Sequence, residues 1–395
     1  MLRRLLILLT VVSVAAITLK VTGVLDPAPQ DPVSEVVDLS FALQKRLEEL
    51  REEVGFPGAT ASFILEDGRS GRIAVGVIDP GGDEAMPLSA RMLAGSVGKM
   101  FVAGVVLDLV GRGVLDLDAP VTDWLGDEPW FSRLPNGPDL TLRNLMNHVS
   151  GIPDHLEQEG YLTDARALSA PGGDPDAVIQ PLQAVGYVLD LEPLGPVGGD
   201  FSYADTNYIL AGLVVEKATG RTYYDLLTER LLEPLGLVET SPQIGRDLPG
   251  LVHGHMHAEN IFGLPALTHG DDGLLTHNPV LEWCGGGVVS TANDLARYAH
   301  LLYRGQALDW DYRPDLLKGV PLKNYDVPGL YGLATFMLKG DLGTTLGHTG
   351  WYPGYHTAVT HYVDHGITVA VQVNRDWETD VRRLADELAY VIVGD

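Results

Sequence analysis

Residues 96–110 read SVGKMFVAGVVLDLV and form the stretch around which the rest of the chain can be interpreted. Apolar residues fall on nearly every face of this stretch at helical spacing, and a helix that is apolar all round belongs in the interior of a protein. Ser96 stands at its start and Lys99 follows three residues later, which makes it the single S-x-x-K among seven lysines. The stretch therefore predicts a central buried helix that carries a serine and a lysine at one end.

Ser96 and Lys99 would share one face of that helix, because residues i and i+3 are neighbours on its surface. Desolvation in an apolar interior favours the neutral amine, which can accept the serine proton. The N-terminus of the helix also stabilises negative charge nearby. The alternative is structural: Ser96 caps the helix and Lys99 extends to solvent.

Composition excludes several classes of protein. The chain has 395 residues, with 27 Lys+Arg against 53 Asp+Glu and a formal net charge of −26. Such acidity argues against nucleic-acid binding, which rests on basic surface. The 45% hydrophobic and 20% charged residues are typical of a globular protein. Because Cys284 is the single cysteine, neither an intramolecular disulfide nor a cysteine-based metal cluster is available.

The N-terminal segment predicts export. Arg3 and Arg4 precede an uncharged, mostly apolar run from Leu5 to Leu19, and Lys20 follows it. Residues 1–25 are therefore interpreted as a signal peptide or a short membrane anchor, and both alternatives place the body of the protein outside the cytoplasm. The proline-rich residues 26–38 are interpreted as a linker.

The pattern beyond the linker predicts one α/β lobe, residues 39–120 and 285–395, around an inserted helical lobe, residues 121–284. Period-2 alternation and turn residues predict strands, and a period of 3.6 predicts helices. Thr291 and Asp294 predict a capping box before a helix. In the α/β lobe we expect helices over 39–54, 295–305 and 377–393, a hairpin of 59–68 with 71–79, and returning strands near 346–350, 355–364 and 366–374.

Two further motifs are weak when taken singly. Tyr203 and Asp205 form a Y-x-D directly before a predicted helix, but Y-x-D recurs at residues 223–225 and 362–364. Residues 348–350 form the single H-T-G in the chain, at the end of a predicted strand where glycine lets a substrate backbone approach closely. Taken alone, this histidine would be interpreted as an ordinary residue at a strand end.

Together and in this order, the three motifs resemble the signature of the serine β-lactamase and penicillin-binding-protein superfamily, S-x-x-K, then Y-x-N, then K-T-G or H-T-G. The flanks also look like the branch of class C β-lactamases, serine DD-peptidases and related esterases: LAGSVGKMFVAGVVLDLVGRGVLDLDAPVTDWL, TLRNLMNHVSGI, FSYADTNYILAGLVVEKATG, LLEPLGL and GGGVVSTANDLARY. The resemblance covers about residues 40 to 393. It implies an α+β, β-lactamase-like fold, with a mainly antiparallel sheet flanked by helices plus the inserted helical lobe.

The resemblance also implies roles for individual residues. Ser96 is the nucleophile that becomes acylated, Lys99 is its base, and Tyr203 relays the proton towards the leaving group. His348 lies on the opposite strand and, with Gly350 and Asp205, is implied to contact the substrate. The oxyanion hole uses the backbone N–H of Ser96 and of Trp351, the residue after Gly350. No cofactor and no metal are implied.

Asp205 departs from the family pattern, in which asparagine is usual. An asparagine side chain can donate a hydrogen bond to a substrate amide carbonyl, whereas an ionised aspartate can only accept one. Its negative charge also favours the protonated form of Lys99. This difference argues against recognition of peptide-like acyl groups.

Residues 253–257 read HGHMH and lie outside the family signature. Alternate positions place His253, His255 and His257 on one face if the segment is extended, an arrangement that could bind zinc or copper. No carboxylate at a recognised spacing completes a metal motif, so a surface or loop cluster is the favoured interpretation.

The sequence thus favours a serine hydrolase that acts through an acyl-enzyme on an ester or a small amide or peptide. DD-carboxypeptidase activity on cell-wall peptides is the first alternative. β-Lactamase activity ranks below it, because His348 replaces the lysine usual in class C enzymes and Asp205 alters the amide contact. A non-catalytic, penicillin-binding-like sensor is the alternative from a different class. The partners expected are a small-molecule or peptide substrate, and the membrane if the N-terminal segment is an anchor.

Overall fold

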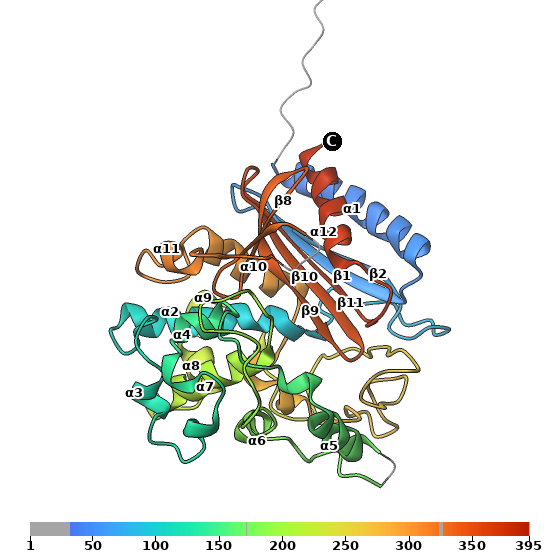
Figure 1. Cartoon of the computed structure of the whole chain (residues 1–395). Helices are drawn as coiled ribbons and strands as arrows, with labels where there is room; N and C mark the ends of the chain where they lie inside the picture. Colours follow the sequence, from blue (N-terminus) through green and yellow to red (C-terminus); the bar gives the residue numbers. More distant parts are fainter. Residues whose placement is uncertain (1–31, 171, 324–326, 395) are drawn as a thin grey trace, which may run out of the picture.

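The computed structural model describes residues 32–170, 172–323 and 327–394 (Figure 1). The predicted export segment lies outside these residues. Within them, no helix has the length and apolar character needed to cross a lipid bilayer. The first helix, α1 (Pro32–Val54), begins seven residues before the predicted start at Leu39. Residues 32–38, which we assigned to the linker, are therefore helical, because proline is well tolerated in the first turn of a helix.

An eight-stranded antiparallel sheet brings the two ends of the body together. Its strand order is β2-β1-β11-β10-β9-β8-β7-β6. The predicted hairpin is confirmed as β1 (Gly58–Ile64) and β2 (Ser70–Gly76), and β1 pairs with the late strand β11 (Ile367–Val373). The other strands of this sheet are β6 (Val320–Pro321), β7 (Gly329–Tyr331), β8 (Phe336–Gly340), β9 (Gly343–Tyr352) and β10 (Tyr355–Tyr362).

Helices cover both faces of this sheet. On one face α1 packs on β2 and against α12 (Val381–Val393), and α12 packs on β10 and β11. On the other face α10 (Ala292–Tyr303) contacts β1, β10 and β11. Figure 1 shows α10 between the sheet and the remaining helices. The fold is α+β, as predicted.

The N-terminus of α10 differs from the predicted capping box. The Thr291 side chain accepts the Asp294 N–H, as expected of an N-cap. The Asp294 carboxylate does not complete the box, because it accepts hydrogen bonds from the Glu239 N–H and the Thr240 hydroxyl. Two partners more than 50 residues away in the chain therefore replace the local one.

The predicted central helix is confirmed as α2 (Lys99–Gly111), in which residues 99–109 are all buried. It contacts α7 (Asp205–Thr219) and α8 (Tyr223–Leu227), so it packs with the helices of residues 121–284 although we placed it in the α/β lobe. The other α-helices are α3 (Thr122–Leu125), α4 (Leu142–Met146), α5 (Glu159–Ser169), α6 (Pro181–Gly186), α9 (Glu233–Leu235) and α11 (Arg313–Leu316).

A small second sheet, of strand order β3-β5-β4, leads into the serine turn. It comprises β3 (Met92–Leu93), β4 (Ser241–Pro242) and β5 (Val288–Ser290). The rest of the chain between α9 and β5 is mostly irregular. The 3₁₀ segments are η1 (Gly95–Gly98), η2 (Phe131–Arg133), η3 (Gly137–Asp139), η4 (His155–Glu157) and η6 (Pro279–Gly285), while η5 (Thr228–Leu232) is a π-helical turn between α8 and α9.

Candidate active site

Ser96 lies in the 3₁₀ turn η1, which runs directly into α2. We predicted an α-helix from Ser96 onwards, and the tighter turn is the difference. Gly95 adopts φ +53°, and a Cβ built there would lie 2.5 Å from the Trp351 carbonyl oxygen. The turn therefore packs directly against the backbone of β9, and position 95 has room only for glycine.

Lys99 is fully buried, so the alternative in which it reaches solvent is excluded. Its Nζ lies 2.9 Å from Ser96 Oγ and 2.5 Å from Asp205 Oδ1, and it also donates to the Gly285 carbonyl oxygen. The predicted Ser96/Lys99 pair is thus formed, and three acceptors surround the amine.

Tyr203 lies on the same side of the site. The Lys99 Nζ is 5.1 Å from the centroid of the Tyr203 ring. His148, which the sequence interpretation did not single out, stacks on that ring at 4.1 Å and accepts the Ala204 N–H with Nδ1. Burial holds the pKa of His148 well below its usual value, so the ring is neutral. His148 therefore fixes the backbone and the ring of the Tyr203 to Asp205 segment.

The structure separates the three Y-x-D pairs. Asp205 contacts Lys99, so this pair belongs to the site. Tyr223 packs in the apolar core, at the start of α8, and its Asp225 lies in the first turn of that helix. The Tyr362 hydroxyl donates to Asp386 on α12.

His348 is on β9 as predicted, but it is absent from the described residues that line the cavity at Ser96. Its Nε2 lies 2.9 Å from the Tyr331 hydroxyl and its Nδ1 lies 2.6 Å from the Thr349 carbonyl oxygen. Burial, and then the positive charge of Lys99, lower the pKa of His348 to about 3. His348 is therefore a neutral imidazole held between two hydrogen-bond partners. The resemblance implies that the residue at this position contacts the substrate.

Gly350 and Trp351 bring β9 against the serine turn. A Cβ built on Gly350 would lie 2.0 Å from the Ala94 carbonyl oxygen, so the two backbones touch. The Trp351 side chain is 40% exposed, lines the cavity, and donates from Nε1 to the Asp376 carbonyl oxygen. The contacts of Gly95 with Trp351 and of Gly350 with Ala94 bring the Trp351 backbone to the serine turn, and the oxyanion hole stays a prediction.

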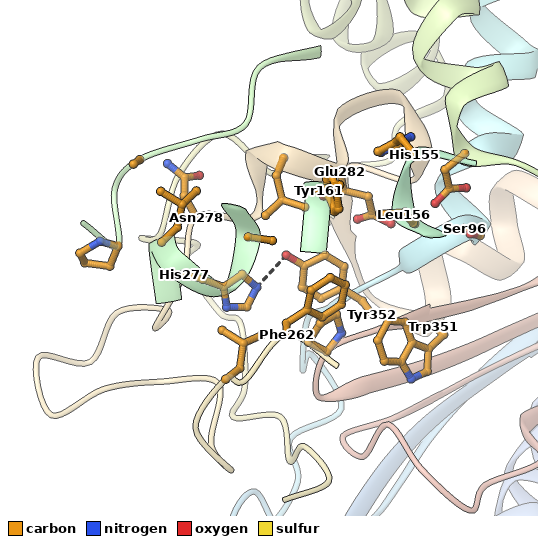
Figure 2. Close-up of a pocket in the computed structure, with 18 residues that line it drawn as sticks. Ser96, His155, Leu156, Tyr161, Phe262, His277, Asn278, Glu282, Trp351 and Tyr352 are labelled. Carbon is orange, nitrogen blue, oxygen red and sulfur yellow. Dashed lines mark hydrogen bonds between the residues drawn. The ribbon is translucent and has the colours of Figure 1, made fainter. Parts of the chain in front are cut away.

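A cavity of about 180 Å³ opens at Ser96 (Figure 2). Polar side chains lie on its wall beside Ser96, including Asp205 and Glu282, and His277 is hydrogen-bonded to the Tyr352 hydroxyl. Most of the wall is apolar and comes from several separate parts of the chain: Leu156, Ala165, Leu168, Pro175, Ala177, Phe262, Leu264, Leu281 and Pro353. The shape suits a small substrate with an apolar group.

Two carboxyl groups near Lys99 were missed by sequence interpretation. Burial raises the pKa of Glu282 to about 8. Burial, and then the charge of Asp205, raise the pKa of Asp154 to about 7. Neither residue stands in a motif, so no local signal marked it. Titratable groups with displaced pKa values gather at functional sites, and both of these carboxyl groups lie close enough to Lys99 for its charge to lower their pKa.

His253 and His255 both approach Asp79, the latter at 3.9 Å, but His257 does not join them. His253 Nδ1 lies 2.9 Å from Asp79, His255 Nε2 faces the Ile78 carbonyl oxygen at the same distance, and His257 accepts the Glu259 N–H. Among the described residues, no group of three His, Cys, Asp or Glu side chains is arranged to hold a metal ion.

Substitution of Gly98 tests whether activity depends on the close contact between the serine turn and Gly286. A Cβ on Gly98 would lie 2.0 Å from the Gly286 carbonyl oxygen, although the φ of −59° suits alanine. Gly98→Ala should therefore shift the turn and lower kcat/KM by about 10²-fold, the scale of a misplacement of about 1 Å. Kinetics on an ester checks this, with Gly186→Ala as the control, because no atom lies within 4 Å of a Cβ there and its φ is not positive. Equal activity of Gly98→Ala and wild type would contradict it.

With this geometry in place, comparison with known proteins gives the class. A family model described as Beta-lactamase matches residues 43–392. The chain belongs to the β-lactamase family.

Three relatives illustrate the similarity. Penicillin-binding protein 4* of Bacillus subtilis is 26% identical over 311 residues, 75% of this chain and 64% of that protein. A D-aminopeptidase of Brucella anthropi is 30% identical over 204 residues, 51% of this chain and 35% of that protein. The solved D-stereospecific amidohydrolase from Streptomyces sp. has a TM-score of 0.75 and 27% identity, covering 90% of this chain and 99% of that one. The chain thus spans less than two thirds of the length of these two curated relatives.

Proposed function

We propose that this protein is a serine hydrolase that forms an acyl-enzyme on Ser96 and acts on an ester or a small amide or peptide. The observation that carries the proposal is the 2.9 Å contact between Ser96 Oγ and the buried Lys99 Nζ at the mouth of the cavity. A nucleophile and a base within hydrogen-bond reach are the recognisable elements of covalent catalysis.

The chemistry would run in two steps. Lys99 in its neutral form takes the Ser96 proton while Oγ bonds to the carbonyl carbon, and the N–H groups of Ser96 and Trp351 stabilise the oxyanion. The proton then passes to the leaving group, with Tyr203 beside the amine as the relay. In the second step water gives a proton to the same base and attacks the carbonyl carbon of the acyl-enzyme. The bond to Ser96 Oγ then breaks, the base returns the proton to this oxygen, and the acid is released.

The relatives support the amide and peptide part of this range, because two of the three have names that denote aminopeptidase or amidohydrolase activity. DD-carboxypeptidase activity remains the alternative, supported by the penicillin-binding relative. β-Lactamase activity ranks lower, since the neutral His348 offers no positive charge to a β-lactam carboxylate. The close pairing of Ser96 with Lys99 argues against a non-catalytic sensor.

We also propose that the protein works outside the cytoplasm, released or held at the membrane by residues 1–25. The basic residues and apolar run of that segment support this. Sequencing the N-terminus of the protein recovered from membrane and from medium distinguishes an anchor from a cleaved signal. Recovery of the full chain in the cytoplasm would contradict export.

Labelling of Ser96 tests the acyl-enzyme directly. A fluorophosphonate should modify Ser96 and no other serine, since Ser96 is the serine that the structure pairs with a buried lysine. Mass spectrometry of the labelled peptide decides the site. Ser96→Ala should lose the label, while Ser202→Ala, next to Tyr203 but outside the pair, should keep it. A label on another serine, or none on folded protein, would overturn the mechanism.

A further inference from the structure

The charges of the cavity restrict what can bind there. Among the described residues that line it are two carboxyl groups, Asp205 and Glu282, and no lysine or arginine. Burial lowers the pKa values of both lining histidines, His155 and His277, to about 4, so neither is cationic at neutral pH. The amine of Lys99 is already paired with Asp205. A negatively charged substrate group therefore meets no counter-charge on this wall, whereas a cation meets Glu282.

Glu282 is placed beside the reacting groups. A Cβ built on Gly285 would lie 3.5 Å from Glu282 Cγ and 3.7 Å from Asp205 Cγ, so the two carboxyl side chains flank one backbone position. The carbonyl oxygen of Gly285 is itself an acceptor for Lys99. Gln243 donates to Glu282 Oε2 at 2.8 Å and holds the side chain in place. Since burial raises its pKa to about 8, Glu282 carries a proton at neutral pH until a cation joins it.

Two buried polar atoms on the same wall lack partners. The Tyr161 hydroxyl and His277 Nδ1 have no hydrogen-bond partner among the described residues, and these residues are 0% and 6% exposed. Both line the cavity. Buried polar atoms are normally hydrogen-bonded, so these two are available to polar groups of a ligand. The apolar wall around them can take an aliphatic or aromatic side chain.

Resting on the hydrolase function above, we propose that Glu282 selects acyl donors that carry a positively charged amino group beside an apolar side chain. The ammonium of the substrate donates to the Glu282 carboxylate, and the apolar side chain fills the cavity. Substrates whose recognised group is a carboxylate are disfavoured, because no lysine or arginine is among the described residues that line the cavity, and the nearby amine of Lys99 is already paired with Asp205. The preference for a cationic substrate group would distinguish this protein from its penicillin-binding relatives, because penicillin carries a carboxylate.

Protection of Ser96 in the wild-type protein gives the first test. The rate of labelling by a neutral fluorophosphonate is measured with 2-phenylethylamine, a cation, and with 3-phenylpropionate, an anion of similar size. The amine should slow labelling at a concentration at least about 10-fold lower than the acid, the scale of one charge-assisted contact. Equal protection, or better protection by the acid, overturns the proposal.

Matched substrates give the second test. Phenylalanine p-nitroanilide, in both enantiomers, differs from 3-phenylpropionyl p-nitroanilide only by the amino group. Wild type should prefer one enantiomer of phenylalanine p-nitroanilide. The ratio to be measured is kcat/KM for that enantiomer divided by kcat/KM for 3-phenylpropionyl p-nitroanilide. Glu282→Gln should reduce this ratio by roughly 10- to 100-fold. Glu259→Gln, an exposed carboxylate on the loop that also carries Phe262, should leave the ratio unchanged.

The outcomes separate this proposal from the hydrolase function. If Ser96 is labelled but the amine gives no preferential protection, the hydrolase stands and the role of Glu282 is refuted. If Ser96 is not labelled in folded protein, the hydrolase itself fails. Where Glu282→Gln does not fold or neither anilide is cleaved, the protection experiment on wild type decides. An unchanged ratio in folded Glu282→Gln is a refutation.

Discussion

Replacing Lys99 by methionine is expected to lower kcat by about 10²-fold or more, the usual scale for loss of a general base. Methionine keeps much of the side-chain volume in the fully buried position and removes the amine that lies 2.9 Å from Ser96 Oγ. No other described amine or guanidinium lies within hydrogen-bond reach of this oxygen. Steady-state hydrolysis of a p-nitrophenyl ester by wild type and Lys99→Met measures the loss.

Lys99→Met should also lower the stability of the fold, an effect that the sequence alone did not indicate. Lys99 neutralises Asp205 at 2.5 Å, and removing one member of a buried ion pair destabilises proteins by about 3 kcal/mol or more. The double variant Lys99→Met/Asp205→Asn removes the orphaned charge, so thermal unfolding should show it to be more stable than Lys99→Met alone. Its kcat should remain as low. Unchanged hydrolysis in folded Lys99→Met would mean that the Ser96 proton leaves by another route, with Tyr203 the first suspect.

The features that the sequence predicted well are those determined by the residue pattern within a single short segment. The apolar run after Ser96, the hairpin of β1 and β2 and the late strands follow from local periodicity, and the structure confirms them. The i, i+3 spacing likewise places Ser96 and Lys99 side by side whatever the rest of the chain does. The ordered motifs then supplied the family.

What the sequence could not predict depends on contacts between distant segments. Glu282 has no motif around it and becomes part of the site because η6 packs against η1. His148 lies more than 50 residues from the backbone N–H that it accepts. His348 Nε2 lies 2.9 Å from the hydroxyl of Tyr331, which is on a different strand, β7. In each case the partner is brought by the tertiary fold, which a pattern in one segment does not encode.

Asp205→Asn is expected to change the pH profile of hydrolysis. The carboxylate lies 2.5 Å from Lys99 Nζ, and an opposite charge at such a distance stabilises the protonated amine, which cannot act as a base. An asparagine keeps the size and removes the charge. The acidic limb of kcat/KM should therefore move to lower pH. The profile of an ester substrate on both proteins measures the shift, and Asp225→Asn, from a Y-x-D pair outside the site, is the control.

The same variant should also change which substrates are preferred, for a separate reason. Asp205 lines the cavity, where its carboxylate can only accept hydrogen bonds and repels a substrate carboxylate. Asparagine supplies an N–H to an acyl-amide carbonyl and takes one negative charge away. Activity on D-Ala-D-Ala peptides or nitrocefin should therefore rise relative to simple esters. Because the pH limb depends on charge beside Lys99 and the substrate ratio depends on a donor facing the cavity, either can move without the other. If neither moves, the contact between Asp205 and Lys99 has no part in the reaction.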